Sequence, residues 1–385
     1  MLAATQNLEM KMTTKTPVDP NGLMEFSVVF TDRSLNHMSK SFQGVMTDIS
    51  SMLGEVYSAD EVALVPGGGT FAMEAVARQF GGGAHALIVR NGWFSYRWSQ
   101  IFEAGNFAAK TTVMKARQAG NDTRAPFAPA PIEDVVAAIR EAKPDVVFAP
   151  HVETSAGMIL PDDYLKAMSD AAHEVGALLV LDCIASGCIW VDMKATGVDV
   201  LISAPQKGWS ATPSAGLVMM SARAAARLAE TTSDSFSMDL KKWRAIMVAY
   251  EEGGHAYHLT MPTDGLRAFR DTMAETKDYG FEKLKAAQWD LGRKVRAILE
   301  AKGIKSVAAE GFQAPGVVVS YTDDPTVQNG SAFVAKGMQI AAGVPLQCDE
   351  PADFRTFRLG LFGLDKLYDV DGTVGRLTPV LDAVL

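Results

Sequence analysis

Hydrophobic positions divide most of the chain into two alternating kinds of segment. Short runs of apolar, often β-branched residues are followed by longer segments in which apolar residues recur at helical spacing. Continuous apolar strands separated by helices are typical of a mainly parallel sheet that is covered on both faces. The predicted strands are 62–66, 85–90, 111–114, 145–150, 177–182, 198–203 and 217–221, and the predicted helices are 71–80, 95–104, 132–142 and 161–175.

The pattern differs towards both ends of the chain. A polar segment precedes the alternation, and after it a long helical stretch runs from Leu266 towards Ala301, followed by strand candidates at 316–321 and 357–361. A change of pattern of this kind indicates a large domain joined to a smaller one. The sequence therefore predicts an α/β protein in three parts: an N-terminal arm (1–25), a large domain with a mainly parallel sheet (26–264) and a smaller α+β domain (265–385).

Composition excludes some classes of partner. Of the 385 residues, 48% are apolar and 21% are charged, which suits a globular protein with a sizeable core. The net charge of −9 provides no extended basic surface. We therefore predict that neither nucleic acid nor an anionic membrane is a partner.

The cysteines and the N-terminal sequence indicate the compartment. Cys183, Cys188 and Cys348 fit neither a zinc site nor a disulfide framework, so we predict no metal and a reducing environment. No apolar run reaches the length of a membrane span, and residues 1–15 lack the apolar stretch of a signal peptide. A cytoplasmic protein is the expectation. Three methionines are alternative natural starts: Met1, Met10 and Met12.

Two charged residues follow neighbouring buried strands. Asp182 ends the strand 177–182, and Lys207 comes shortly after the strand 198–203, at a separation of 207 − 182 = 25 residues. Alone, Asp182 would be a helix cap and Lys207 a solvated lysine. Together they suit pyridoxal 5′-phosphate (PLP), because a lysine can form a Schiff base with it and a carboxylate can keep its pyridine nitrogen protonated.

The segments 182–186 (Asp-Cys-Ile-Ala-Ser) and 203–207 (Ser-Ala-Pro-Gln-Lys) resemble the class V aminotransferases of PLP fold type I. The similarity extends over roughly residues 37 to 380 and is strongest to the alanine–glyoxylate and serine–glyoxylate aminotransferase branch. The resemblance implies PLP as the cofactor and Lys207 and Asp182 as catalytic residues. It also implies that Ile184 and Gln206 contact the cofactor.

A glycine-rich turn, Gly67-Gly-Gly-Thr70, opens a predicted helix after a strand. Backbone N–H groups and the helix N-terminus can hold an anion there, although such a turn is often only a tight connection. The resemblance implies that Gly68, Gly69 and Thr70 bind the cofactor phosphate. The family often has serine where Gly68 stands.

Two further segments resemble the family's cofactor site. In Asn91-Gly-Trp-Phe94 the resemblance places a ring on the pyridine face, Phe94 being the first candidate and Trp93 the second; a core aromatic is the alternative. His151-Val-Glu-Thr-Ser-Ala-Gly157 resembles the segment that places Thr154 near the cofactor's phenolic oxygen. His151 and Glu153 can equally be structural residues of this loop.

The resemblance also assigns residues outside this group. Tyr257-His-Leu-Thr260 matches an element that reaches into the neighbouring subunit, so we predict a homodimer in which Tyr257 and Thr260 bind the partner's cofactor phosphate. Phe357-Arg-Leu-Gly matches the motif whose arginine, here Arg358, binds the substrate α-carboxylate as a planar fork. From the residues alone Arg358 would be a surface arginine, and Arg355 lies close to it in the sequence.

These residues predict a ping-pong aminotransferase that moves an amino group from a small α-amino acid to an oxo acid. The resemblance suggests alanine, serine or aspartate as donor and glyoxylate or pyruvate as acceptor. Two departures bear on the substrate: residues 18–26 lack the usual Gly-Pro-rich segment, and 208–216 replaces the usual Pro-Pro-Gly pattern, where Trp209 could reshape the pocket.

Three alternatives remain open. A class V cysteine desulfurase would need Cys348 as its nucleophile, but Asp349-Glu-Pro follows in place of a small, Ser/Gly-rich loop. A transaminase for an aminophosphonate would use the same cofactor residues. A catalytically silent PLP-binding protein would not need Lys207, Asp182 and Arg358 together.

Overall fold

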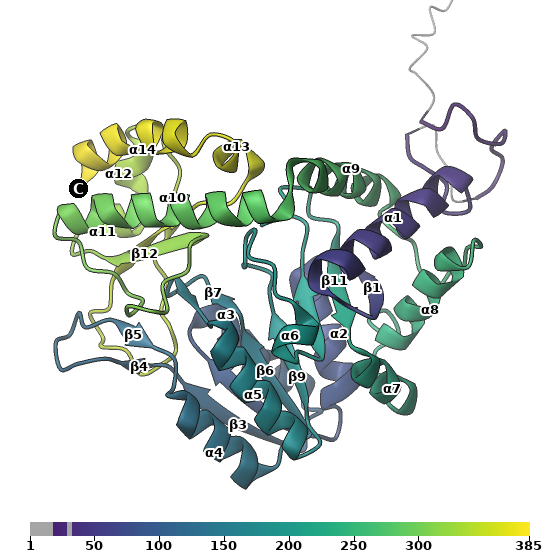
Figure 1. The fold of residues 1–385 in the computed structure, drawn as a ribbon, viewed down its shortest axis with the longest axis horizontal. Coiled ribbons are helices and arrows are strands. Elements are labelled where there is room, and N and C mark those ends of the chain that lie inside the picture. The colour runs from purple at the N-terminus through teal and green to yellow at the C-terminus, as the bar shows by residue number, and fades with distance from the viewer. Residues whose placement is uncertain (1–17, 29–32) are drawn as a thin grey trace, which may run out of the picture.

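A computed structural model describes residues 18–28 and 33–385 and contains two main sheets with helices packed around them (Figure 1). The larger sheet belongs to the first two thirds of the chain and the smaller one to the last third (Figure 1). The expectations for residues 1–17, including the three alternative starts, lie outside the described residues.

The larger sheet is mainly parallel, as predicted. Strand β11 is antiparallel to both of its neighbours, and every other neighbouring pair in the sheet is parallel. The four central strands from β11 to β6 are buried along their whole length, which explains their uninterrupted apolar sequences. The strand order is β1 (Glu61–Pro66), β11 (Ala215–Met220), β10 (Val200–Ser203), β9 (Leu178–Asp182), β6 (Val146–Pro150), β2 (His85–Arg90) and β3 (Lys110–Lys115).

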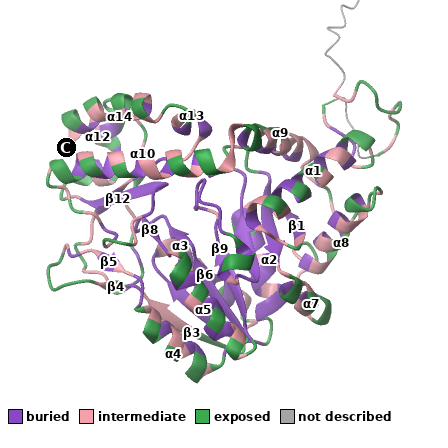
Figure 2. Ribbon diagram, in the orientation of Figure 1, coloured by how far each residue is buried: buried purple, intermediate pink, exposed green. Residues whose placement is uncertain are grey.

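Helices pack on this sheet along its width, and their outer surfaces are exposed (Figure 2). Polar caps fix several of their starts: Ser39, Ser221 and Asp239 each accept a hydrogen bond from a backbone N–H of the first turn. The helices of this part are α1 (Lys40–Tyr57), α2 (Gly69–Gly81), α3 (Trp93–Gly105), α4 (Ile132–Ala142), α5 (Asp162–Glu174), α6 (Met193–Thr196), α7 (Ala222–Glu230) and α8 (Leu240–Glu251).

The smaller sheet is antiparallel, with β14 between β12 and β13. Helices α10 and α14 pack against each other, and α10 also packs on β12. The remaining elements are β4 (Arg117–Gln118), β5 (Phe127–Ala128), β7 (Val152–Glu153), β8 (Met158–Ile159), β12 (Val317–Tyr321), β13 (Ala341–Ala342), β14 (Thr356–Gly360), α9 (Thr263–Tyr279), α10 (Phe281–Ala301), α11 (Pro325–Gln328), α12 (Ser331–Val334), α13 (Leu364–Leu367) and α14 (Val370–Val384).

The predicted helical stretch from Leu266 towards Ala301 is helical and is interrupted once. Gly280 has a φ of +108° and ends the helical path, so two helices, α9 and α10, occupy this stretch. Helix α9 packs on α1, beside the large sheet, whereas α10 packs on the small sheet. The division between the domains at residue 264 stays a prediction.

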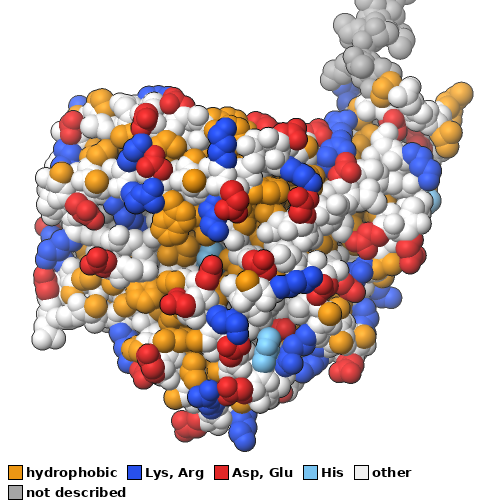
Figure 3. All heavy atoms as spheres, in the orientation of Figure 1, with side chains coloured by type: hydrophobic (Ala, Val, Ile, Leu, Met, Phe, Trp, Pro, Cys, Tyr) orange, Lys and Arg blue, Asp and Glu red, His pale blue; other side chains and the backbone are white. Residues whose placement is uncertain are grey.

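The surface and the helices are ordinary for a globular chain. Acidic and basic side chains are interspersed over the face shown in Figure 3. Among the described residues, no helix combines the length and the apolar character that are needed to cross a membrane.

Candidate active site

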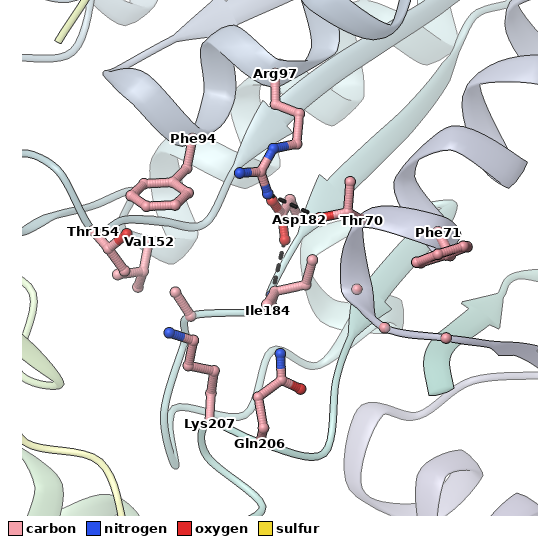
Figure 4. Close-up of a pocket in the computed structure, with 14 residues that line it drawn as sticks. Thr70, Phe71, Phe94, Arg97, Val152, Thr154, Asp182, Ile184, Gln206 and Lys207 are labelled. Atoms are coloured by element: carbon pink, nitrogen blue, oxygen red, sulfur yellow. Dashed lines mark hydrogen bonds between the residues drawn. The ribbon is translucent and has the colours of Figure 1, made fainter. Parts of the chain in front are cut away.

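A cavity of about 420 Å³ lies where the segments after five strands of the large sheet converge (Figure 4). Sites of α/β sheets form at the carboxyl ends of strands for this reason. Every predicted cofactor contact lines this cavity except Tyr257 and Thr260. The lining consists of Gly67, Gly68, Gly69, Thr70 and Phe71 after β1, Phe94 and Arg97 after β2, Val152 and Thr154 after β6, Asp182, Ile184 and Ala185 from β9 onward, and Gln206 and Lys207 after β10.

Asp182 is a buried carboxyl group whose neighbours offset little of the cost of burying its negative charge. Its side chain accepts a hydrogen bond of 2.9 Å from the backbone N–H of Ile184. Burial raises the pKa of Asp182 to about 7; the Ile184 N–H opposes this rise, the charge of Glu153 adds to it and that of Arg97 opposes it. A carboxylate in this position is stabilised by a protonated group that enters the cavity.

Lys207 contributes a primary amine to the lining of the cavity. Its Nζ lies 5.6 Å from the centroid of the Phe362 ring. Burial, and then the nearby charge of Arg358, lowers the pKa of the lysine. A lowered pKa increases the share of the neutral amine, which is the nucleophilic form.

The backbone next to Lys207 packs tightly against the backbone of Gly187. A Cβ on Gly208 would lie 2.1 Å from the carbonyl oxygen of Gly187, so this contact requires glycine. Trp209 is 1% exposed and packs on Trp190 with ring centroids 4.8 Å apart. Trp209 is not among the residues that line the cavity, and its ring is part of the hydrophobic core, so an effect of Trp209 on the pocket stays a prediction.

The glycine-rich turn leads directly into helix α2. Gly68 is the N-cap residue and supplies no side-chain cap, so the positive end of the helix faces the cavity with backbone groups alone. A Cβ on Gly69 would lie 2.4 Å from Cδ1 of Ile184, so any larger residue at this position would force the Ile184 side chain to shift. The turn thus presents backbone groups and a helix N-terminus to the cavity, an arrangement that suits an anion.

Glu153 fixes the helix that carries Phe94. Its buried carboxylate accepts hydrogen bonds from the backbone N–H of Phe94 (3.1 Å) and from both the N–H (2.8 Å) and the hydroxyl (2.7 Å) of Ser95. These bonds cap the start of α3 and support a structural role for Glu153. Trp93 packs on Tyr96 and is not part of the cavity lining, whereas Phe94 is.

His151 is equally buried but lies outside the lining. Its Nδ1 is 2.7 Å from the hydroxyl of Ser186, and burial lowers its pKa to about 3. The ring is therefore neutral at ordinary pH. Thr154, on the same loop, does line the cavity.

Three predicted residues lie outside this lining. Tyr257 is 58% exposed, and its hydroxyl is 3.4 Å from that of Thr260. Arg358, on β14, places its guanidinium 5.6 Å from the centroid of the Phe94 ring and donates a hydrogen bond to the carbonyl of Ala342 (2.8 Å). The structure thus brings Arg358 to the edge of the site and leaves the Tyr257 element on an exposed surface.

Among the lining residues that were not predicted from the sequence, Arg97 is the charged one. Arg97 lies on α3 three residues after Phe94 and therefore on the same face of the helix. Its Nη1 donates a hydrogen bond of 2.9 Å to the hydroxyl of Thr70 (Figure 4). The helical spacing from Phe94 was the signal that could have found it.

Cys348 does not have the surroundings of a nucleophile. It is 4% exposed, and its thiol donates to the carbonyl of Arg90 at 3.4 Å. Burial raises its pKa to about 12, which opposes formation of the thiolate. The cavity lining does not include it.

The chain is similar to known proteins along most of its length. A model of the family described as aminotransferase class-V matches residues 25–343. The 2-aminoethylphosphonate–pyruvate transaminase of Paraburkholderia phymatum is 27% identical over 359 residues, which are 90% of this chain and 89% of that protein.

Solved structures share the fold. The alanine–glyoxylate aminotransferase of Nostoc sp. has a TM-score of 0.74 at 23% identity and covers 91% of this chain and 89% of its own. An aspartate aminotransferase of Thermus thermophilus has a TM-score of 0.73 at 24% identity, with coverages of 91% and 93%. Because the family model matches more than half of the chain, the protein belongs to the class V aminotransferase family, as its motifs predicted.

Proposed function

We propose that the protein is a PLP-dependent aminotransferase whose cofactor binds in the cavity between Lys207 and Asp182. The observation that carries this proposal is that both residues, from the ends of neighbouring strands, line one cavity. The cavity residues fit the group: a buried carboxyl group has its pKa raised by burial, an apolar ring and Ile184 border the same space, and a helix N-terminus lies beside it. PLP, when bound, supplies an electron-accepting pyridinium ring.

The chain's own residues then have separate tasks. Lys207 binds the cofactor covalently and accepts the proton from Cα of the amino donor, a task that its lowered pKa favours. Asp182, in its ionised form, holds the proton on the pyridine nitrogen. Gly68, Gly69 and Thr70 bind the phosphate through the N-terminus of α2.

Arg358 is the residue that we propose to bind the substrate anion. Its guanidinium lies beside the Phe94 ring, at the edge of the cofactor site. A small α-amino acid such as alanine, serine or aspartate would be the donor, and glyoxylate or pyruvate the acceptor, in a ping-pong cycle. The alanine–glyoxylate and aspartate aminotransferases that share the fold support this choice loosely.

An aminophosphonate donor is the second candidate. It is favoured by the 27% identity to a 2-aminoethylphosphonate–pyruvate transaminase over 90% of the chain. A guanidinium fork binds phosphonate oxygens as well as carboxylate oxygens, so Arg358 suits both donors.

We also propose a homodimer in the cytoplasm. Tyr257 and Thr260 lie on an exposed surface of their own subunit, which suits a contact with the cofactor phosphate of a partner copy. Three free, buried cysteines suit a reducing compartment.

A screen of amino donors tests the proposal. The protein loaded with PLP is mixed with alanine, serine, aspartate or 2-aminoethylphosphonate, and glyoxylate or pyruvate serves as acceptor. We expect a loss of the cofactor's visible absorbance with the donor alone, and its return when the acceptor is added. If no donor changes the spectrum, the chain binds the cofactor without transamination, and the proposal is rejected.

A further inference from the structure

Arg97 contacts two parts of the candidate cofactor site at once. Its Nη1 donates to the hydroxyl of Thr70 on the phosphate-binding turn, and its Cζ lies 5.4 Å from the centroid of the Phe94 ring. Figure 4 shows its guanidinium pointing from α3 into the cavity that Asp182 also lines. One side chain therefore contacts both the turn and the ring, and it lines the same cavity as Asp182.

The charge of Arg97 is not neutralised by a neighbouring carboxylate. Over the described part of the chain, the salt bridges within 4.0 Å do not include Arg97, whereas Arg78, on the preceding helix, contacts both Glu74 and Asp234. A guanidinium has five N–H donors, and the hydrogen bond to Thr70 uses one of them. The remaining donors are available to an anionic ligand or to Asp182.

Three groups from three segments decide the charge state of Asp182. The Ile184 N–H and the Arg97 guanidinium favour the carboxylate, while Glu153 on β7 disfavours it. Burial disfavours the carboxylate more than any of them. Of these groups, Arg97 is the cation, and its charge adds to the larger effect of the Ile184 N–H in favouring the ionised form.

We infer that Arg97 is a positioning residue for the cofactor: it orients the Thr70 hydroxyl towards the phosphate and, through its positive charge, keeps Asp182 anionic for the pyridine nitrogen. The inference rests on the proposed function, since it assumes that PLP is the ligand. It assigns Arg97 no contact with the reacting atoms.

The test compares three variants with the wild type. Arg97→Met removes the charge and the donors at similar volume, and Arg97→Lys keeps the charge but loses the planar fork. Arg78→Met is the matched control, because Arg78 also lies over a phenylalanine, Phe107, at 5.0 Å but outside the cavity. The measurement is the Kd for PLP, from absorbance titration of cofactor-free protein at pH 6.5 and pH 8.

We expect the Kd of Arg97→Met to rise about 10- to 100-fold at pH 8, the range for losing a hydrogen bond from a charged donor. At pH 6.5 the rise should be larger, because Asp182 without Arg97 is protonated at a higher pH. Arg97→Lys should keep the pH dependence of the wild type while its Kd stays raised, and Arg78→Met should bind as the wild type does.

Two results overturn the inference. One is an Arg97→Met protein that binds PLP within about twofold of the wild type at both pH values; the other is an Arg97→Lys protein with the pH dependence of Arg97→Met. If Arg97→Met fails to fold, as judged by circular dichroism, Arg97→Gln provides the same change of charge. A wild type that does not bind PLP at all rejects the proposed function instead, so the two failures are distinguishable.

Discussion

The guanidinium of Arg358 lies over the ring of Phe94, 5.6 Å from its centroid. Arg358 comes from β14 of the small sheet, and Phe94 from α3 beside the large sheet. A substrate anion bound by Arg358 would therefore be held next to the ring that borders the cofactor cavity. The two sheets must keep this arrangement for the substrate to meet Lys207.

Replacing Arg358 should weaken the use of anionic substrates. Loss of a buried, bidentate charged contact costs about 2–5 kcal/mol, so Arg358→Ala should lower kcat/KM roughly 30-fold or more. Arg358→Lys should recover only part, because an ammonium cannot form the planar fork. Arg355→Ala, whose guanidinium donates to the carbonyl of Asp323, is the control and should retain activity. If Arg358→Ala uses every donor normally, the substrate anion is bound elsewhere.

Borohydride should fix the cofactor to Lys207. The protein is reduced after loading with PLP, digested, and the labelled peptide is identified by mass spectrometry. We expect the label on Lys207, because its amine lies in the cavity and its pKa is lowered by burial. Lys207→Ala should still bind PLP but should not turn over. A label on any other lysine would contradict the assignment.

The burial of Asp182 should appear in the stability of the cofactor-free protein. Its folded pKa of about 7 lies above the value of ~3.9 expected in the unfolded chain. The folded state therefore binds more protons between these values, and this group's contribution to stability falls as the pH rises from about 4 to 7.

Asp182→Asn should remove this pH dependence. Relative to wild type, the free energy of unfolding of the variant should be higher at pH 8 than at pH 5, by on the order of 2–3 kcal/mol. Urea unfolding at the two pH values measures this difference. The same variant should lose most of its transaminase activity, and near-normal turnover would remove Asp182 from the mechanism.

Cys348→Ala should leave transamination nearly unchanged. The thiol is buried, its pKa is raised to about 12, and transamination needs no thiol. Activity with the best donor and sulfide release from cysteine are measured side by side. Loss of activity together with sulfide release by the wild type would favour a desulfurase.

Hybrid dimers test whether the active sites are shared. Lys207→Ala lacks its own lysine, and a Tyr257→Phe, Thr260→Ala double variant lacks the groups offered to its partner's phosphate. Each alone should be inactive or weak. Mixing them under subunit exchange should restore activity, because one site of each hybrid combines an intact lysine with an intact Tyr257 element. Sedimentation of an active monomer would exclude this arrangement.

The sequence by itself determined the large sheet and the two residues at its centre. Strands buried on both faces must be apolar throughout, so 146–150 and 178–182 were recognisable without knowledge of their neighbours. Asp182 and Lys207 stand out because each follows such a strand. Their nearness also follows from the pattern, since parallel strands end at the same edge of the sheet.

The tertiary structure decided what depends on contacts between distant segments. Glu153 caps α3, and Arg97 meets Thr70, through side-chain hydrogen bonds whose partners are not signalled by local pattern. The sequence could not show that the Trp209 ring lies in the core, because an apolar ring suits a pocket wall and a core equally well. Only the packing of the chain determines which of these environments an apolar ring occupies, and only folding brings the partners of a hydrogen bond together.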